Sequence, residues 1–186
     1  MTAVKPEDKC WYPMRVTYSR EMKVKEALDA LDVENFLPMQ WRIVDDKKVY
    51  RKKKLVPAIS NLIFIHASRQ LISKLKTTRT ALRPLRYITA KAATPANKSE
   101  ILVVPDRQME NFMRVAGVED ERVMFLDNND FVNRIGQRVR ITEGFFAGVE
   151  GEIKRIQGNR RVMVRLEGIA AVAITFVPSS CIELTE

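Results

Sequence analysis

The chain has 186 residues and a net charge of +9, which suits one ordinary domain or two small ones, each with its own hydrophobic core. Hydrophobic residues make up 46% of it, and it holds only 7 Gly and 8 Pro, so a collagen-like or largely disordered protein is excluded. No apolar run approaches the roughly 18 residues of a membrane span, and the N-terminus lacks the apolar core of a signal peptide, so we expect a cytoplasmic protein.

The first elements in chain order are a strand, a helix and two more strands. Residues 11–17 mix aromatic and β-branched side chains, which is typical of a strand, although Pro13 requires an edge position or a bulge. Ser19 is the expected N-cap of a helix, because apolar residues recur at helical spacing from Val24 to Leu31. Residues 36–44 and 55–67 are predicted strands, and residues 45–54 between them are expected to form a loop or a distorted hairpin.

The next segments continue the alternation of helices and strands. Leu71, Ile72 and Leu75 predict a short helix, residues 85–89 a strand, and residues 101–104 a strand or an extended lead-in. Pro105 and Gly117 frame a third helix, since Pro suits a helix start and Gly the position just past its end. These elements together predict an α+β sandwich with an antiparallel sheet over residues 1–116.

The second part of the chain predicts a different fold class. Residues 118–133 are acidic and aperiodic, so we expect residues 117–133 to be a linker. From Gly136 onward, short alternating segments and Gly-rich turns predict about five strands in residues 134–186, which suits a small closed all-β barrel.

The positive charge belongs to the first part. Residues 1–116 carry a net charge of +11, residues 117–133 carry −4, and residues 134–186 carry +2. Such a field attracts nucleic acid through its phosphates. The densest run supplies the candidate nucleic-acid contacts Lys47, Lys48, Arg51, Lys52, Lys53 and Lys54. The alternative is that this run is a solvated face.

No recognisable constellation of catalytic residues occurs in the sequence. It contains no nucleophile elbow, Walker loop or glycine-rich dinucleotide turn, and a lone His66 at the end of an apolar strand is more typical of a hydrogen-bonded strand residue than of a catalyst. One His and two distant Cys offer no zinc-ligand spacing. We therefore expect a binding protein, not an enzyme, without a metal or a cofactor.

Two segments together closely resemble the NusG family of transcription elongation factors. The stretch GQRVRITEGFFAGVEGEI, residues 136–153, is similar to the KOW motif that opens an SH3-like barrel. The first part of the chain resembles the family's N-terminal domain in the order and spacing of four segments. These are Trp11-Tyr12, the helix with Glu21, Lys23 and Val24, Leu37-Pro38-Met39, and Leu62-Ile63-Phe64-Ile65. The resemblance spans nearly the whole chain and implies an N-terminal NusG-type domain (1–116), an acidic linker (117–133) and a KOW domain (134–186).

One departure from the family pattern points to a specialised member. Where the family usually has Phe-Pro-Gly-Tyr or Phe-Pro-Asn-Tyr, this chain has Ile59-Ser60-Asn61-Leu62. Together with the Lys-rich insertion, this favours a paralogue of the RfaH or UpxY kind, the latter found with bacterial capsular polysaccharide operons. Glycines and β-branched strands favour a barrel over the helical C-terminal hairpin of the RfaH type.

The resemblance implies a protein that rides on bacterial RNA polymerase and increases processivity. The clamp helices of the largest subunit would sit in an apolar depression lined by Tyr12, Ile59 and Leu62, and the gate loop would meet Ser73, Lys74 and Thr77. The alternative for Ile59 and Leu62 is that they fill the core. Non-template DNA or nascent RNA would meet the basic run.

The KOW domain implies a second partner, such as a ribosomal protein or a termination factor. Phe145 and Phe146 are the candidate contacts, because exposed aromatic residues at a loop tip supply apolar area, and one of the two is expected to be core. A competing hypothesis from the same residues is a ribosome- or RNA-associated KOW protein whose basic first domain grips RNA.

Overall fold

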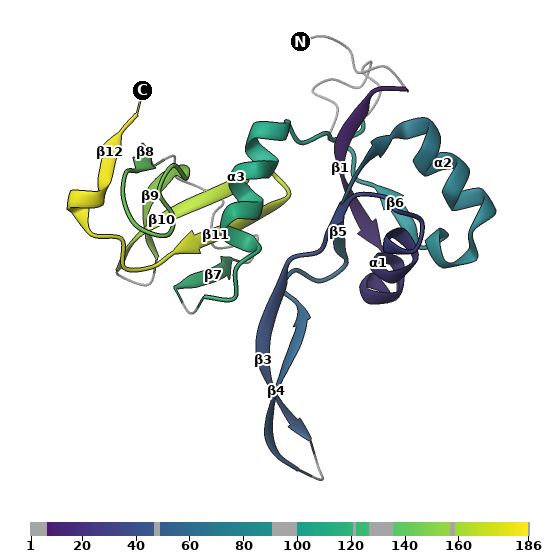
Figure 1. Ribbon diagram of the computed structural model, residues 1–186, viewed down its shortest axis with the longest axis horizontal. Helices are drawn as coiled ribbons and strands as arrows, with labels where there is room; N and C mark the ends of the chain where they lie inside the picture. The colour runs from purple at the N-terminus through teal and green to yellow at the C-terminus, as the bar shows by residue number, and fades with distance from the viewer. Residues whose placement is uncertain are drawn as a thin grey trace. The chain divides into compact units, whose positions relative to one another are not determined.

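The computed structural model describes residues 7–46, 49–90, 100–120, 122–126, 136–156 and 159–185, and the side chains of residues 44–51 are outside that description. The chain divides into two compact units (Figure 1). Unit 1 comprises Met1–Leu37 and Ile59–Asp106, and unit 2 comprises Pro38–Ala58 and Arg107–Glu186. The predicted boundaries at residues 116 and 134 do not coincide with this division.

Unit 1 is built on a four-stranded antiparallel sheet of order β2-β5-β1-β6. Its strands are β1 (Lys9–Val16), β2 (Asn35–Phe36), β5 (Leu62–Ser68) and β6 (Leu85–Tyr87). The helices α1 (Glu21–Asp29) and α2 (Arg69–Thr78) lie on the same side of the sheet in Figure 1, and a short 3-10 helix η1 (Thr80–Leu82) follows α2. β5 is central because four consecutive apolar residues from Leu62 to Ile65 are all buried.

The helices α1 and α2 begin differently: α2 has a side-chain N-cap and α1 has none. Ser68 caps α2, since its Oγ accepts a hydrogen bond from the Leu71 amide at 3.2 Å. The expected cap of α1 is wrong: Arg20 occupies the N-cap without a side-chain bond, and Ser19 adopts a left-handed φ of 48°. Instead Glu21, in the first turn of α1, is buried and its Oε1 accepts from the Asn61 amide at 2.5 Å. That bond joins α1 to the turn before β5.

Residues 39–57 form a long antiparallel hairpin of β3 (Met39–Asp46) and β4 (Val49–Pro57) (Figure 1). Of the two alternatives for residues 45–54, the distorted hairpin is confirmed and the loop is wrong, because cross-strand pairing continues to Asp46 and Val49 with a register shift between Val44 and Asp46. The predicted strands over 36–44 and 55–67 are each interrupted. Leu37-Pro38 separates β2 from β3, and residues 58–61 separate β4 from β5.

Unit 2 contains a six-stranded antiparallel sheet of order β12-β8-β9-β10-β11-β7. Its strands are β7 (Val123–Leu126), β8 (Gln137–Ile141), β9 (Glu150–Ile156), β10 (Asn159–Leu166), β11 (Ala170–Ile174) and β12 (Ile182–Leu184), and a 3-10 helix η2 (Ser179–Cys181) precedes β12. The expected closed barrel is wrong. Over the described ranges β12 pairs with β8 and β7 pairs with β11, so the sheet stays open between its two edge strands.

The sixth strand comes from the segment that was expected to be a linker. β7 pairs with β11 over Leu126↔Ala171 to Val123↔Ile174. Its four apolar residues are too short a run to show a period, which is why the sequence did not indicate them. The rest of that predicted linker includes residues 121 and 127–133, which lie outside the described residues.

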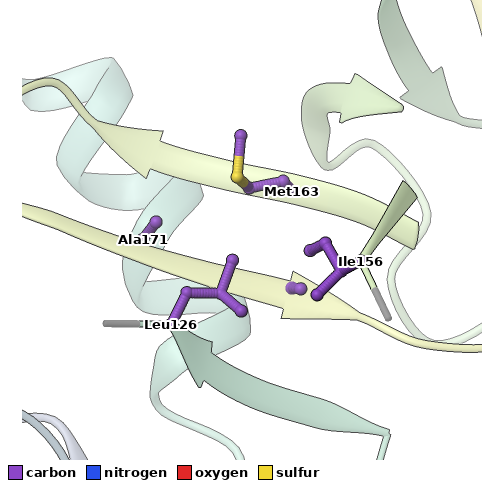
Figure 2. Close-up of a cluster of buried hydrophobic side chains, with 5 residues drawn as sticks. Leu126, Ile156, Met163 and Ala171 are labelled. Carbon is purple, nitrogen blue, oxygen red and sulfur yellow. The ribbon is translucent and has the colours of Figure 1, made fainter. Parts of the chain in front are cut away.

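The core of unit 2 is formed by buried side chains of its sheet strands, and part of it is drawn in Figure 2. One cluster joins four strands through Leu126, Ile156, Met163, Ala171 and Ala173. Burial of a large aliphatic side chain contributes about 1.5–3 kcal/mol. The helix α3 (Asp106–Ala116) agrees with its predicted frame of Pro105 and Gly117, and buries Met109, Phe112, Val115 and Ala116. Within the described ranges, no helix is both long and apolar enough to cross a bilayer.

Candidate functional site

The apolar residues predicted for the first contact surface divide into buried and accessible ones. Tyr12 and Leu62 are only 2% and 4% exposed, so they are core residues of the unit 1 sheet. The Tyr12 ring meets the Tyr87 ring edge-on at 5.7 Å, and Leu62 pairs with Arg15 across β1 and β5. Ile59 is half-buried in the turn before β5. Of the three, Ile59 is therefore the one that offers apolar surface to a partner.

The second predicted group, Ser73, Lys74 and Thr77, is exposed on α2. The Thr77 hydroxyl donates to the Lys74 carbonyl at 2.8 Å. Burial raises the pKa of Tyr87, while a hydrogen bond with Ser73 lowers it. The Lys76 ammonium lies 5.1 Å from the Tyr87 ring, and burial together with the charge of Arg86 lowers the pKa of Lys76. This face of α2 is polar and cationic.

An exposed aromatic residue near the Ile59 turn was missed by sequence reasoning. Tyr18 is 83% exposed and has a φ of 65°, which is strained for a residue with a bulky side chain. The Val16 amide donates to the Asn61 carbonyl at 3.0 Å, so the ends of the segments carrying Tyr18 and Ile59 meet at one end of the sheet. The local sequence does not mark Tyr18 as a residue of positive φ, because Asn and Asp are the non-glycine residues that favour this conformation.

The basic run lies on the β3–β4 hairpin of unit 2. Lys52, Lys53 and Lys54 are exposed, whereas Lys47 and Lys48 lie outside the described residues and Arg51 is described only as backbone of β4. Successive strand residues face opposite sides, and cross-strand partners share a side. The pairs Arg42↔Lys54 and Val44↔Lys52 therefore put Lys52 and Lys54 on one face, and Ile43↔Lys53 puts Lys53 on the other.

The opposite face of the hairpin carries large apolar side chains beside Lys53. Trp41 and Ile43 are 52% and 55% exposed although both are large hydrophobic residues. The Trp41 indole Nε1 donates to the Glu119 carboxylate at 2.6 Å, and the two apolar residues line an open cavity of about 470 Å³ together with Val123 and Phe125. The hairpin thus has one face with Arg42, Lys52 and Lys54, and an opposite face on which Trp41 and Ile43 lie with Lys53.

The two predicted partner-binding aromatics have different environments. Phe145 is 67% exposed and Phe146 is buried, so one of the pair is core as expected. Their rings meet edge-on at 5.1 Å, in a turn between Gly144 and Gly148, which adopt φ values of 83° and 84°. The Arg122 guanidinium lies 5.3 Å from the Phe146 ring.

Two arginine side chains, Arg122 and Arg114, contact this turn or the residues beside it. Hydrogen bonds from the Arg122 side chain and backbone lower the pKa of Asp120 to about 2. From α3, Arg114 Nη2 donates to the Ala147 carbonyl at 2.8 Å. Arg122 therefore contacts the turn through the Phe146 ring, and Arg114 contacts it through the Ala147 carbonyl.

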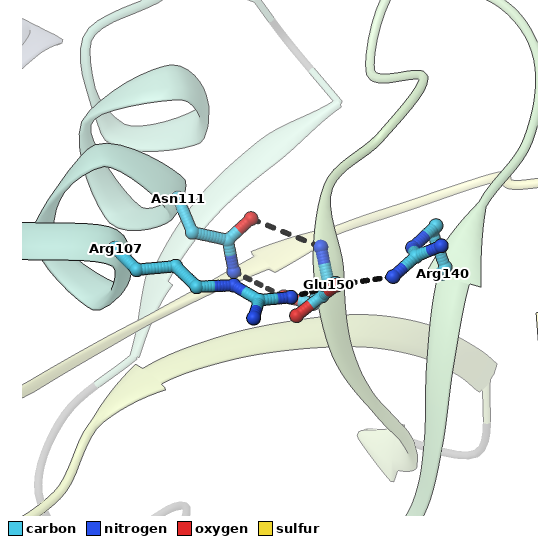
Figure 3. A network of polar contacts seen from close by, with 4 residues as sticks. All are labelled: Arg107, Asn111, Arg140 and Glu150. Carbon is cyan, nitrogen blue, oxygen red and sulfur yellow. Dashed lines mark hydrogen bonds and ion pairs between the residues drawn. The ribbon is translucent and has the colours of Figure 1, made fainter. Parts of the chain in front are cut away.

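A polar network joins α3 to β9, as Figure 3 shows. Asn111 Oδ1 accepts from the Glu150 amide at 2.9 Å, and its Nδ2 donates to the Glu150 carbonyl. The Glu150 carboxylate accepts from Arg107 and Arg140, each at 2.7 Å, and the hydrogen bond from Arg140 is the main cause that lowers the pKa of Glu150. The network lines an open cavity of about 440 Å³ with Arg138 and Arg165.

The described residues do not assemble a metal centre. Among them, no three His, Cys, Asp or Glu side chains gather to hold an ion. His66 Nδ1 lies 2.5 Å from the Glu34 carboxylate, and its ring stacks on Trp11 with centroids 4.9 Å apart. His66 is therefore a hydrogen-bonded strand residue, as its position in β5 predicts.

Comparisons with known proteins bear on the family of the chain. The family model NusG, described as transcription termination factor nusG, matches residues 9–113, which is more than half of the chain. A structure describing domain interaction in Thermotoga maritima NusG is similar over 98% of this chain and 100% of its own, with 18% identity and a TM-score of 0.45. The MjSpt4:Spt5 complex in conformation B is similar over 94% and 95%, with 11% identity and a TM-score of 0.25. No curated protein matches the chain significantly.

Proposed function

The chain belongs to the NusG family of transcription factors, and from this premise we propose that it is an elongation and antitermination factor that binds RNA polymerase through unit 1. The observation that carries the proposal is the extent of the family match. Residues 9–113 include every residue assigned to polymerase contact. Members of this family act by binding and not by covalent chemistry, so holding the polymerase clamp closed would suffice to reduce pausing.

The clamp helices of the largest polymerase subunit would contact the end of unit 1 that carries Ile59. Exposed Tyr18 adds aromatic area at the same end of the sheet. Buried Tyr12 and Leu62 would support this surface from below without touching the partner. An apolar contact with a helix combines burial with shape, which is the usual basis of a strong anchor.

The gate loop would contact Ser73, Lys74 and Thr77 on α2. Their exposure on one helix, with the charge of Lys74 among them, supports an interaction with a polar loop. Contact with both sides of the polymerase cleft would stabilise the closed clamp.

Exposed non-template DNA or nascent RNA would contact the cationic face of the β3–β4 hairpin. Arg42, Lys52 and Lys54 share that face, and Arg42 and Lys54 lie directly opposite one another. Like charges in that arrangement repel unless a polyanion neutralises them. Tethering to polymerase would make weak phosphate contacts effective.

Unit 2 would bind a second partner, a ribosomal protein or a termination factor, through exposed Phe145. Aliphatic residues at Ile59 and Leu62, where the family usually has aromatic ones, support a specialised role of the UpxY or RfaH kind, such as surface polysaccharide operons.

The test uses the full chain with an affinity tag. Pull-down from a bacterial lysate should enrich polymerase subunits, and single-round transcription should show more readthrough at pause and termination sites. Ile59→Glu should remove both effects, because a carboxylate disrupts an apolar contact. Leu184→Glu places the same charge on an exposed apolar residue of unit 2 and serves as the matched control.

Two outcomes would refute the proposal. Equal polymerase recovery with both variants would place the contact elsewhere. Ribosomal particles recovered without polymerase would favour the RNA-associated alternative.

A further inference from the structure

Glu21 is one of two buried charged side chains in the described part of the chain. The other, Glu152, pairs with Arg165 at 3.0 Å, whereas the ion pairs of the described residues include none with Glu21. A buried carboxylate without a cation costs free energy that an apolar residue at the same place would not. Packing alone therefore does not explain why a glutamate occupies this position.

The Glu21 carboxylate holds the main chain of the turn before β5. Its Oε1 accepts from the Asn61 amide at 2.5 Å, and the Asn61 carbonyl accepts from the Val16 amide at 3.0 Å. Asn61 has a φ of 60°, a left-handed conformation that Asn adopts more readily than most residues. Both polar groups of the Asn61 main chain are thereby bonded, one to α1 and one to β1.

This anchored residue controls the place of Ile59. Only Ser60 lies between Ile59 and Asn61, and Leu62 on the other side is a buried residue of β5. Ile59 is half-buried and Ser60 is exposed, so the accessible surface of the turn lies directly before the anchor. Without the bond from Glu21 the turn gains backbone freedom, and Ile59 is no longer held in one position.

Glu21 also begins the helix that follows the loop with exposed Tyr18. Tyr18 and Ser19 have φ values of 65° and 48°, and the Arg20 guanidinium lies 5.6 Å from the Tyr18 ring. Because Glu21 is the first residue of α1, its carboxylate connects the Tyr18 segment to the turn that carries Ile59. One side chain thus sets the relative position of both groups.

We propose that Glu21 is a positioning residue for polymerase binding, whose carboxylate fixes the turn that presents Ile59 relative to the loop that presents Tyr18. The inference rests on the proposed contact of this end of unit 1 with the clamp helices. Two apolar groups held in a fixed relation bind a helix more tightly than the same groups on a free turn, which loses conformational entropy on binding. Glu21 itself is 4% exposed and acts only through the turn.

The test compares two substitutions of Glu21 in the full chain. Glu21→Gln keeps an acceptor oxygen for the Asn61 amide, and Glu21→Met keeps a long side chain without an effective acceptor. Titration of the labelled protein with purified bacterial core RNA polymerase should give Glu21→Gln an affinity near that of the wild type. Glu21→Met should bind roughly tenfold more weakly. Hydrogen exchange of the Asn61 amide should be faster in Glu21→Met than in Glu21→Gln.

A control variant separates positioning from a general loss of stability. Val24→Ala removes buried packing from the same helix and no hydrogen-bond acceptor. It should lower the melting temperature and leave the polymerase affinity of the folded protein unchanged. Glu21→Ala also lacks the acceptor, and it repeats the comparison if Glu21→Met does not fold.

A double-mutant cycle shows whether Glu21 acts through Ile59. Ile59→Ala should weaken polymerase binding, because it removes most of the apolar side chain that the turn presents. Adding Glu21→Met to Ile59→Ala should then weaken binding by much less than it does in the wild type, since the two residues serve one contact.

Three outcomes would overturn the inference. They are multiplicative losses in the cycle, equal losses of affinity in Glu21→Gln and Glu21→Met, and an equal loss in Val24→Ala. If Ile59→Ala weakens binding and Glu21→Met does not, the inference fails while the proposed function stands. If Ile59→Ala itself has no effect, the proposed polymerase contact fails as well.

Discussion

The side-chain amide of Asn111 pairs with the main chain of Glu150 as a neighbouring strand would, accepting from its amide at 2.9 Å and donating to its carbonyl. The β9–β10 ladder ends at the pair Met163↔Glu152, and Glu150 lies two residues earlier in β9, beyond that end of the ladder. Asn111 therefore continues the pairing where the partner strand stops. A helix residue thus satisfies two backbone groups that would otherwise lose their partners.

Replacing Asn111 by Ala should destabilise unit 2 by about 1–3 kcal/mol, because it leaves a half-buried amide and carbonyl of Glu150 without their partner. Gln108→Ala, on the exposed face of the same helix, is the matched control and should cost little. Chemical denaturation measures the free energy of unfolding, and hydrogen exchange reads the Glu150 amide directly. An unchanged exchange rate at that amide would contradict the strand-like role.

The Glu150 ion pairs predict an acid dependence. Arg140 and Arg107 hold the pKa of Glu150 below its ordinary value of 4.5. A depressed carboxyl pKa contributes stability that is complete above the unfolded value and is lost as the pH falls through the folded one. The difference in unfolding free energy between the wild type and Glu150→Gln should therefore narrow below pH 4.5. Urea titrations over a pH series check this, and a constant difference would contradict it.

Gly151 is required by close packing between strands. A Cβ there would lie 2.6 Å from the Met163 carbonyl oxygen and 3.0 Å from Val162 Cγ1. Gly151→Ala should cost about 1–3 kcal/mol through overpacking. Gly168→Asn is the control, because that position has a φ of 70° in open space and Asn tolerates this conformation. Thermal melts of both variants measure the loss of stability. An equal loss in Gly151→Ala and Gly168→Asn would argue against a steric cause.

Leu62 and Ile59 should respond differently to the same substitution. Leu62 is 4% exposed, so Leu62→Glu buries an unpaired carboxyl and should destabilise unit 1 by more than about 3 kcal/mol. Half-buried Ile59 should accept Glu with a much smaller loss. Melting curves of the two variants test this difference in stability. Similar melting temperatures would mean that Leu62 lies at an accessible surface.

The two faces of the β3–β4 hairpin predict unequal roles for three adjacent lysines. Lys52 and Lys54 share the cationic face with Arg42, and Lys53 lies with Trp41 and Ile43. Lys52→Gln with Lys54→Gln should flatten the salt slope of nucleic-acid binding by about 1.4–1.8, whereas Lys53→Gln should leave it nearly unchanged. Anisotropy titrations give both slopes. Equal effects per lysine would mean that the hairpin does not bind through one face.

The sequence by itself determined where most elements lie. Helical spacing of apolar residues located α1, α2 and α3, and the apolar run at Leu62 located the central strand. Each type of element buries its side chains with a characteristic period, which is visible in the sequence. The motif residues indicated the NusG family, which the family model then showed for residues 9–113. All of these signals come from residues that are close together in the sequence.

Tertiary structure alone decided which residues of each motif are accessible. Tyr12 and Leu62 are buried while Ile59 is not, and Phe145 is exposed while Phe146 is buried, because packing between segments far apart in sequence selects one of two similar side chains. Strand register assigned Lys53 to the face opposite its neighbours. Val123–Leu126 likewise forms a strand because it pairs with β11. Four residues are too few to show the alternation that predicts a strand from sequence.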